Sequence, residues 1–440
     1  MRQQRPITIT GGKLVTPDGV RDAAIRFVDG NIVEIGGEAY DGDLTVDAKG
    51  LLVAPGLVDL GVFAIDKPAF HFGGITRAAL MPDQSPPLDL PSRISYIAKS
   101  GKPDFWVHPL AAASRGMEGR EIAELALMRD AGARGVATGR QWIPDSGVML
   151  RLLQYAAMLD MVVIAHAEDA ALVGGAVATA GEIATRRGLP SAPAAAESIA
   201  LARDIALAEL ANARIHFRQV TTREGLEIVR AAKARGAKVT CGITPAHFML
   251  SDLATVDFRT FARLSPSLRS EDDRRAVREA IADGTIGVIA SGHDPRGPED
   301  KRLPFSDAEP GMAGAETLLA MTLSLVRDDV IDMGRAFELV AATPAGILGV
   351  DAGVIMEGYE ADIVLVGVSR TSKTPLSMYL AQRGYKTGNV PLVSGLAPSP
   401  ALAEIDPRRV FGLVVDHATL LTMRINRLKV LRASPHSSYT

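Results

Sequence analysis

The sequence predicts an α/β protein that contains a parallel (β/α)8 barrel and a small antiparallel sheet. From residue 51 to about residue 290, short apolar runs alternate with helical stretches, which is typical of repeated strand–helix units. Eight such runs occur, the number that a closed barrel needs. Residues 7–35 instead alternate apolar and polar positions, as a half-buried antiparallel sheet does. The 440 residues, 47% of them hydrophobic, suffice for a barrel of about 250 residues and a smaller domain.

The barrel elements follow from the apolar runs and from the caps between them. Strands are predicted at residues 57–63, 75–81, 104–108, 134–138, 161–166, 214–220, 238–243 and 286–291. Helices are predicted at residues 120–130, 147–159, 195–211, 222–235 and 271–282, several of them opened by Ser, Thr or Asp.

The flanking regions have simpler patterns. Asp29-Gly30 separates two apolar runs and predicts a hairpin. Residues 315–326 and 333–348 are predicted helices, and residues 357–366 return to strand character. Residues 369–407 are rich in Ser, Pro and Gly and are predicted loops, before final strands at 410–415 and 420–430.

Composition excludes several classes of protein. A net charge of −3 provides no basic stripe for nucleic acid and no polybasic membrane patch. No run of about 18 apolar residues occurs, and the N-terminus lacks the apolar core of a signal peptide, so a cytoplasmic protein is expected. The single cysteine, Cys241, follows an apolar strand pattern and is expected to be a buried packing residue.

Short motifs recur along the chain: Pro55-Gly-Leu-Val-Asp-Leu60, Met81-Pro82, Asp145-Ser-Gly147, Ala165-His-Ala-Glu-Asp169, Thr244-Pro-Ala-His247, His293-Asp-Pro295 and Gly314-Ala-Glu-Thr317. In their order and spacing, over roughly residues 5–370, they resemble those of the dihydroorotases of the amidohydrolase superfamily. The resemblance implies an amidohydrolase-type barrel at residues 55–354. It also implies a small discontinuous β-sandwich built from both termini, residues 1–54 and 355–432.

The same resemblance implies a zinc enzyme that interconverts carbamoyl aspartate and dihydroorotate, yet the family's metal positions are degenerate here. Zinc is needed because it lowers the pKa of bound water towards about 7. At five of the family's six metal-ligand positions the residue lacks a metal-binding side chain; these residues are Gly61, Phe63, Thr138, Gln219 and Gly292. Only His166 survives, and catalytic zinc requires three protein ligands. We therefore expect no metal, no cofactor and no catalytic residue.

The family's substrate-binding positions have changed too, to Ile65, Asp83 and Ser265. Phe63 is expected to fill the old cavity, while Arg140 balances charge there. Glu168 and Asp169 are predicted to cap the next helix, and His216 to pack on the outer face of its strand. Possible residual ligand contacts are His247, His293, Asp294 and Arg296.

Three functions remain open. The favoured interpretation is an inactive dihydroorotase-like protein that assembles with aspartate transcarbamoylase in a hetero-oligomer and also self-associates. The alternative is an active dihydroorotase or other cyclic amidohydrolase with a rearranged metal site around His166, His247, His293 and Asp294. A third is a binding module for a pathway nucleotide or intermediate.

The predicted partner surface lies at the start of the barrel. Only nine residues lie between Phe63 and Gly73-Gly74, where the second strand begins, about half of what the family has, so the first crossover helix is expected to be absent or reduced to a turn. Outward side chains such as Val62 and Leu80 would then be exposed, together with Phe70, His71 and Phe72, unless residues 82–92 or the segment after residue 369 covers them.

Overall fold

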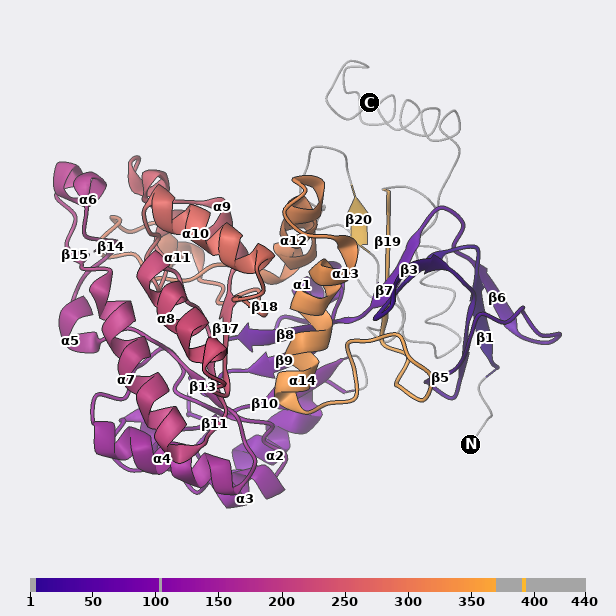
Figure 1. The fold of residues 1–440 in the computed structure, drawn as a ribbon, viewed down its shortest axis with the longest axis horizontal. Coiled ribbons are helices and arrows are strands. Elements are labelled where there is room, and N and C mark those ends of the chain that lie inside the picture. Colours follow the sequence, from indigo (N-terminus) through magenta and orange to yellow (C-terminus); the bar gives the residue numbers. More distant parts are fainter. Residues whose placement is uncertain (1–4, 103–104, 369–389, 393–440) are drawn as a thin grey trace, which may run out of the picture. The chain divides into compact units, whose positions relative to one another are not determined.

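The computed structural model describes residues 5–102, 105–368 and 390–392. The chain divides into two compact units, one formed by Met1–Gly56 with Val354–Thr440 and the other by Leu57–Gly353. Figure 1 shows the elements of both. No helix among the described residues is long and apolar enough to cross a membrane.

The larger unit is built on parallel strands that follow one another in sequence order. They are β8 (Leu57–Val62), β9 (Ile75–Leu80), β10 (Trp106–Pro109), β11 (Ala111–Ala112), β12 (Val136–Ala137), β13 (Val163–Ala165), β16 (Ile215–Phe217), β17 (Val239–Ile243) and β18 (Val288–Ile289). β10 and β11 are two parts of one strand position, which Leu110 joins, so the eight predicted positions are all present.

The strand order is that of a (β/α)8 barrel, as predicted. β8, β9 and β10 form one sheet, and β11, β12, β13, β16, β17 and β18 form a second, with every pairing parallel. Within the described part of this unit no ladder joins β18 to β8, but the Phe63 amide donates to the His293 carbonyl across 2.8 Å. The loops beyond the carboxyl ends of the strands therefore converge on one mouth.

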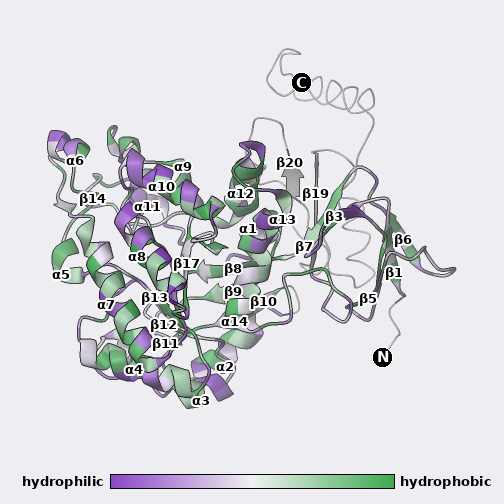
Figure 2. Cartoon of the chain, viewed as in Figure 1, coloured by the Kyte–Doolittle hydropathy of each residue, from purple (hydrophilic) through white to green (hydrophobic). Residues whose placement is uncertain are grey.

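Helices cover the strands from outside, as the amphipathic patterns predict. They are α2 (Pro91–Ser100), α3 (Leu125–Asp130), α4 (Ser146–Met158), α7 (Ala195–Ala211), α8 (Arg223–Ala234), α10 (Glu271–Ala282), α12 (Leu318–Arg327), α13 (Met333–Phe337), the π-helix η5 (Glu338–Ala342) and α14 (Thr343–Leu348). α4, α7, α8 and α10 pack in that order. Figure 2 shows hydrophilic and hydrophobic stretches together on α8 and α10.

Shorter elements form the loops between strands. They are α1 (Lys67–Gly73), η1 (Arg115–Met117), α5 (Ala170–Val173), β14 (Ala178–Thr179), α6 (Glu182–Arg187), β15 (Ser191–Ala192), α9 (Pro245–Met249), η2 (Asp252–Thr255), η3 (Thr260–Ala262), α11 (Pro298–Lys301) and η4 (Ala315–Thr317).

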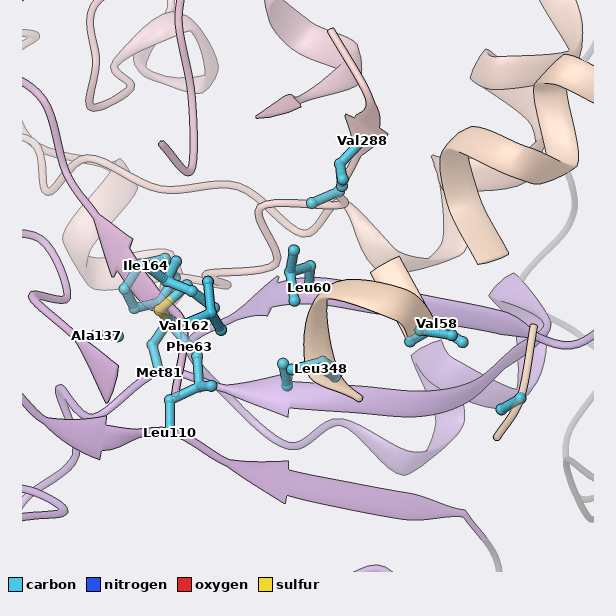
Figure 3. Close-up of a cluster of buried hydrophobic side chains, with 14 residues drawn as sticks. Val58, Leu60, Phe63, Met81, Leu110, Ala137, Val162, Ile164, Val288 and Leu348 are labelled. Carbon is cyan, nitrogen blue, oxygen red and sulfur yellow. The ribbon is translucent and has the colours of Figure 1, made fainter. Parts of the chain in front are cut away.

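Apolar side chains fill the interior of the strand array. Phe63, Met81, Val162 and Ile164 belong to one buried cluster that continues through Leu60 towards the other end of the strands (Figure 3). Phe63 is only 7% exposed. It therefore adds apolar volume near the mouth, as its position in the sequence suggests.

The smaller unit contains two sheets whose strands come from both ends of the chain. One has the order β5 (Asn31–Ile35), β4 (Ile25–Val28), β1 (Ile7–Thr10), β6 (Leu44–Asp47). The other has the order β20 (Val390–Leu392), β19 (Ile363–Val368), β7 (Leu52–Pro55), β2 (Lys13–Thr16), β3 (Gly19–Asp22). β19 pairs antiparallel with β7, which confirms a discontinuous β domain. Asp29 and Gly30 both have positive φ, as the hairpin turn requires.

The structure corrects the prediction for the first crossover connection. This connection contains α1, a seven-residue helix, so the crossover helix is short, as predicted, but it is not reduced to a turn and does not leave the strands uncovered. Phe70, His71 and Phe72 are 0%, 4% and 5% exposed, and Val62 and Leu80 are buried as well. Phe70 packs edge-on against Phe105 at 5.3 Å, and α1 packs against η4. The predicted partner surface at these residues is therefore wrong.

Smaller predictions also changed. The helix predicted at residues 120–130 begins only at Leu125, and α2 is not among the predicted helices. β20 lies inside the segment predicted as loops. The strands predicted at residues 410–415 and 420–430 lie outside the described residues.

Candidate functional site

A pocket opens at the mouth of the barrel, beyond the carboxyl ends of β8, β12, β16, β17 and β18. It encloses about 420 Å³, including space open to solvent. Its lining residues come from these strand ends and from the loops after them: Phe63, Arg140, Arg218, Gln219, Thr244, His247, Leu264, Ser265, Gly292, Asp294, Pro310, Gly311 and Met312. This is where the carboxyl ends of parallel strands place functional groups in a barrel.

The degenerate metal positions lie around this mouth without forming a donor set. Phe63, Gln219 and Gly292 line the pocket. Thr138 is buried, and its hydroxyl accepts a hydrogen bond from the His166 amide at 2.9 Å. A Cβ added at Gly61 would meet only the Ala290 Cβ, at 3.6 Å. No group of three His, Cys, Asp or Glu side chains in the described part of the chain is placed to hold a metal ion.

His166 uses both of its ring nitrogens. Its Nδ1 lies 3.2 Å from Nη2 of Arg218, and its Nε2 lies 3.3 Å from Oε2 of Glu168. Since a guanidinium only donates, Nδ1 must accept and Nε2 must carry the proton. The imidazole is thus a neutral bridge from a cation to a carboxylate. It offers no free lone pair to a metal.

The bridge continues into a buried ion cluster under the mouth. Glu168 accepts from Arg269 at 2.7 Å, and Arg269 lies 3.6 Å from Glu197. Burial opposes ionisation of Glu168, but the hydrogen bond from His166 and the charge of Arg269 outweigh it and lower the carboxyl pKa to about 2. Asp169 caps α5 as predicted, whereas the cap predicted for Glu168 is wrong, because its carboxylate faces Arg269.

Glu197 is the anchor of this cluster. It is fully buried on α7 and accepts from the backbone amides of Thr221 and Thr222, at 2.9 Å and 2.8 Å, and from both hydroxyls. Its carboxylate therefore holds the loop that follows Arg218 and Gln219. The cluster fixes the backbone on which those two pocket residues stand.

Arg140 occupies the other side of the pocket. Its guanidinium pairs with Asp294 through Nε at 3.1 Å and Nη2 at 2.8 Å, and it lies over the Phe63 ring at 3.9 Å. Asp83 accepts from the Arg140 amide at 3.0 Å. Arg296 also donates to Asp294, at 2.9 Å, but it is not a lining residue. Asp294 is therefore neutralised by two arginines.

His247 belongs to a chain of hydrogen bonds with one consistent direction. Gln219 Nε2 donates to the Thr244 hydroxyl at 3.3 Å, and that hydroxyl lies 2.8 Å from His247 Nδ1. His247 Nε2 lies 3.1 Å from the Pro266 carbonyl and must donate to it. Burial lowers the pKa of His247 to about 4, so the ring is neutral at pH 7. The ring lines the pocket but has no hydrogen-bonding atom to spare.

His293 and Asp294 face different surroundings and form no dyad. His293 is fully buried; its Nδ1 accepts from the Ala315 amide, and its ring packs against Phe70 at 5.8 Å. Its Nε2 is 3.6 Å from Asp66. Burial lowers the pKa of this imidazole. His293 is not among the pocket-lining residues, so it is not placed for the ligand contact that the sequence suggested.

Other predicted residues lie apart from the mouth. His216 is buried and pairs with the Thr240 hydroxyl at 2.9 Å, as expected for a packing residue. Cys241 is buried too, and burial raises the pKa of its thiol to about 12, so it is unreactive. Ser265 lines the pocket, whereas Ile65 is 38% exposed.

Arg218 is the residue that sequence reasoning missed. Strict alternation along residues 214–220 places Arg218 on the outer face with His216. The strand ends at Phe217, however, so the alternation stops one residue before Arg218 and the guanidinium lines the pocket. A lone arginine at the end of an apolar strand was the available signal.

The arrangement does not fit zinc. Three of the family's six metal-ligand positions line a pocket that also contains two arginine side chains. The imidazole of His166, which survives from the ligand set, is engaged at both nitrogens. Cations repel a divalent metal, and the described carboxylates at the mouth are paired with arginines. No hydrolytic step can be derived from these residues through a metal.

Comparison with known proteins identifies the relatives of this chain. Residues 50–225 match a family described as dihydro-orotase-like. The dihydroorotase of Citrifermentans bemidjiense is 36% identical over 379 residues, 82% of this chain and 89% of that protein. The dihydroorotase of Pelotomaculum thermopropionicum is 38% identical over 378 residues, 82% of this chain and 88% of that protein. Residues 348–440 match a family described as kinase/pyrophosphorylase, mostly outside the described residues.

Solved structures with the same fold include the L-hydantoinase (dihydropyrimidinase) of Arthrobacter aurescens. It has a TM-score of 0.73 at 23% identity, and the match covers 82% of this chain and 86% of that one. The dihydropyrimidinase of Brevibacillus agri has a TM-score of 0.70 at 20% identity, covering 82% and 86%. These likenesses support the fold, a parallel-strand barrel with a second domain of β-sheets.

Proposed function

The chain belongs to the dihydroorotase family of amidohydrolases, and from that premise we propose that it is a member without zinc and without hydrolytic activity, which acts in pyrimidine biosynthesis as a structural partner of aspartate transcarbamoylase. It forms a hetero-oligomer with that enzyme, with equal numbers of both chains, and also self-associates. The barrel scaffold is retained while its chemistry is not.

One observation carries the proposal. The contact between Arg218 and His166 places a buried cation against the only side chain left from the metal set. A zinc ion bound at His166 Nδ1 would displace this donor and lie beside its positive charge, while binding at Nε2 would release Glu168. Either event breaks a buried charge-assisted hydrogen bond, which is strongly unfavourable.

The partner role rests on the family resemblance together with the state of the pocket. A chain that keeps a full barrel and a second domain, but fills its mouth with Phe63, Arg140 and Arg218, retains structure rather than catalysis. Assembly with aspartate transcarbamoylase, the preceding enzyme of the pathway, is the role that this retained structure serves. The interface lies elsewhere than Phe70 and Phe72, since both are buried.

An active dihydroorotase is the alternative, and the curated relatives favour it because those named here are dihydroorotases. It would need a rearranged metal site around His166, His247, His293 and Asp294. These four side chains point to separate partners: Arg218, the Pro266 carbonyl, Phe70 and Arg140 respectively. Reaching a common metal would require breaking at least three of those contacts.

Two measurements on one sample test the inactive assignment. After zinc-supplemented expression, elemental analysis is expected to find far less than one zinc per chain, and dihydroorotate formation and hydrolysis are expected to stay at the blank rate. One bound metal per chain, with turnover that His166→Ala abolishes, would establish the alternative instead.

The partner assignment needs its own test. The full chain as bait, mixed with aspartate transcarbamoylase from the same cell, is expected to co-elute in size-exclusion chromatography with a one-to-one chain ratio. An unrelated barrel protein of similar size serves as the control bait. Separate elution at micromolar concentration would reject the hetero-oligomer while leaving the metal result untouched.

A further inference from the structure

The outer face of α7 differs from that of the neighbouring barrel helices. Its exposed side chains are apolar with one exception: Ile199, Ala202, Ala206, Glu209 and Leu210. Ile199 is 50% exposed and Leu210 is 71% exposed. By contrast, α8 and α10 are amphipathic and expose mainly charged side chains. A helix that is apolar on every side normally has its outer face buried as well.

The apolar side chains form one stripe along α7. Ile199, Ala202, Ala206 and Leu210 follow one another at intervals of three or four residues, which places them on one side of an α-helix. The large side chains stand at the two ends of the stripe and the small ones in the middle. The order of sizes is therefore the same in either direction, so the stripe fits a second copy of itself turned end for end.

The apolar surface continues beyond the end of α7. Met158, the last residue of α4, is 83% exposed. Arg214, which follows α7, donates to the Asp160 carbonyl and pairs with its carboxylate at 3.1 Å, so the ends of the two helices lie together. The helices also pack against each other along their lengths. Contiguous apolar patches of this kind on a surface mark interfaces.

The charged groups beside the stripe are already paired within the chain. Arg203 donates to Asp204 at 2.8 Å and to the Ile143 carbonyl at 2.7 Å. Glu209 accepts from Arg235 at 2.6 Å. A partner with a charged face would bury its own charges here without counterions, which is unfavourable. The face therefore fits an uncharged surface, such as the same stripe on another copy.

We propose that two copies of this chain associate through this face, with their α7 helices antiparallel across a two-fold axis. Ile199 of one copy then packs against Leu210 of the other, and Ala202 lies opposite Ala206. A two-fold contact uses the same patch twice, so the patch must complement itself, as this stripe does. The central alanines allow the helix axes to approach to about 8 Å. The inference rests on the self-association in the proposed function and assigns a surface to it.

Sedimentation equilibrium of the full chain alone measures its oligomeric state. The expected mass at micromolar concentration is about 93 kDa, twice the 46.5 kDa of one chain. Leu210→Gln is expected to weaken the dimer by about tenfold, because it places an amide in the apolar contact. Since this side chain is 71% exposed, the variant should stay folded.

Two charge variants test the antiparallel contact. Ala202→Glu combined with Ala206→Glu makes the face acidic, and Ala202→Lys combined with Ala206→Lys makes it basic. Each variant alone is expected to be monomeric, because like charges meet across the two-fold axis. An equimolar mixture is expected to recover a dimer with one chain of each kind. Ala282→Glu, at an exposed alanine on α10, is the matched control and leaves the dimer unchanged.

Each outcome decides the proposal once circular dichroism has verified folding. A monomeric unmodified chain overturns it. A dimer that persists in the folded α7 variants also overturns it, while leaving self-association to another surface. An unchanged dimer in variants that no longer co-elute with aspartate transcarbamoylase would assign the face to that enzyme instead. Should a charge variant fail to fold, Leu210→Gln decides. The zinc and transcarbamoylase tests remain separate, since the chain is measured here by itself.

Discussion

Arg218 Nη2 donates to His166 Nδ1 across 3.2 Å, at the point where relatives with a metal site hold zinc according to the family resemblance. A guanidinium cannot accept, so this one contact fixes the imidazole as the tautomer with its proton on Nε2, facing Glu168 at 3.3 Å. His166 has therefore changed its role from possible ligand to bridge within a charge network. Its remaining importance is for stability.

Replacing His166 by Ala is expected to destabilise the protein by about 2–4 kcal/mol, because it leaves a buried donor of Arg218 and a buried acceptor of Glu168 unpaired and opens a cavity. Chemical denaturation followed by circular dichroism measures the loss. His166→Gln, whose amide can accept from Arg218 and donate to Glu168, should recover part of it. A loss below about 0.5 kcal/mol, within the range of ordinary surface changes, would contradict the bridge.

The backbone at Gly292 opposes reconstruction of the lost site. Gly292 has φ +60°, and a Cβ there would lie 2.7 Å from the Thr244 methyl group. Gly292→Asp, which restores the family's carboxylate, is expected to cost at least about 1–2 kcal/mol from the left-handed backbone alone. Gly61→Ala is the control, because its Cβ meets only Ala290 at 3.6 Å. Thermal unfolding compares the two, and equal melting temperatures would show that the loop adapts freely.

The buried cluster under the mouth should be far more sensitive than surface ion pairs on the same helix. Glu197→Gln is expected to destabilise the chain by about 3–5 kcal/mol, because it leaves Arg269 with less compensation and places an amide NH2 against backbone donors. Glu209→Gln, also on α7, removes only a solvent-screened surface pair with Arg235 and should cost far less. Urea denaturation of both variants measures the two losses of stability. Losses of similar size would show that the buried cluster is no more sensitive than the surface pair.

Sequence reasoning found the barrel and the degenerate ligand positions for a physical reason. Apolar runs with caps between them define strand–helix units, and a missing donor atom at Gly61 or Phe63 is visible without coordinates. What replaced the lost donors was not visible. The inward turn of Arg218 depends on β16 ending at Phe217, and strand ends are set by tertiary hydrogen bonds.

The prediction for the first crossover connection was wrong for a different reason. Pro68 would break a helix at an interior position, but it lies in the first turn of α1, where proline has no hydrogen bond to lose. Asp66 accepts from the Ala69 amide at 3.1 Å, and Gly74 ends the helix with φ 75°. Both cap signals were present in the sequence. Given these caps, a seven-residue helix fits where a full crossover helix does not.

The corrected crossover changes the expected effect of charged substitutions there. Phe70→Glu places a carboxylate at a fully buried site between Phe105 and His293, so it should unfold or severely destabilise the chain rather than only disrupt assembly. Phe70→Leu, which keeps an apolar side chain, is the milder comparison. Circular dichroism and size-exclusion chromatography separate the outcomes, and a fully folded Phe70→Glu chain would show that α1 can detach.

Asp204 is the group most suited to a pH test, because it lies beside one of the two tryptophans. Trp142 Nε1 donates to Asp204 Oδ2 at 3.1 Å, and Arg203 donates to Oδ1 at 2.8 Å. Burial outweighs both partners and raises the carboxyl pKa to about 6 from its ordinary 3.8. The folded state therefore holds the proton more tightly than the unfolded chain.

The sign of the pH effect follows from this. A raised pKa contributes stability that is fully present below 3.8 and is lost as pH rises through about 6. The stability of the unmodified protein, relative to Asp204→Asn, should therefore fall between pH 4.5 and pH 7.5, because the variant has no proton to lose there. Urea denaturation at several pH values, followed by tryptophan fluorescence, gives the difference. A difference that is constant with pH, or that grows as pH rises, would mean that the charge of Arg203 outweighs burial and that Asp204 is ionised throughout.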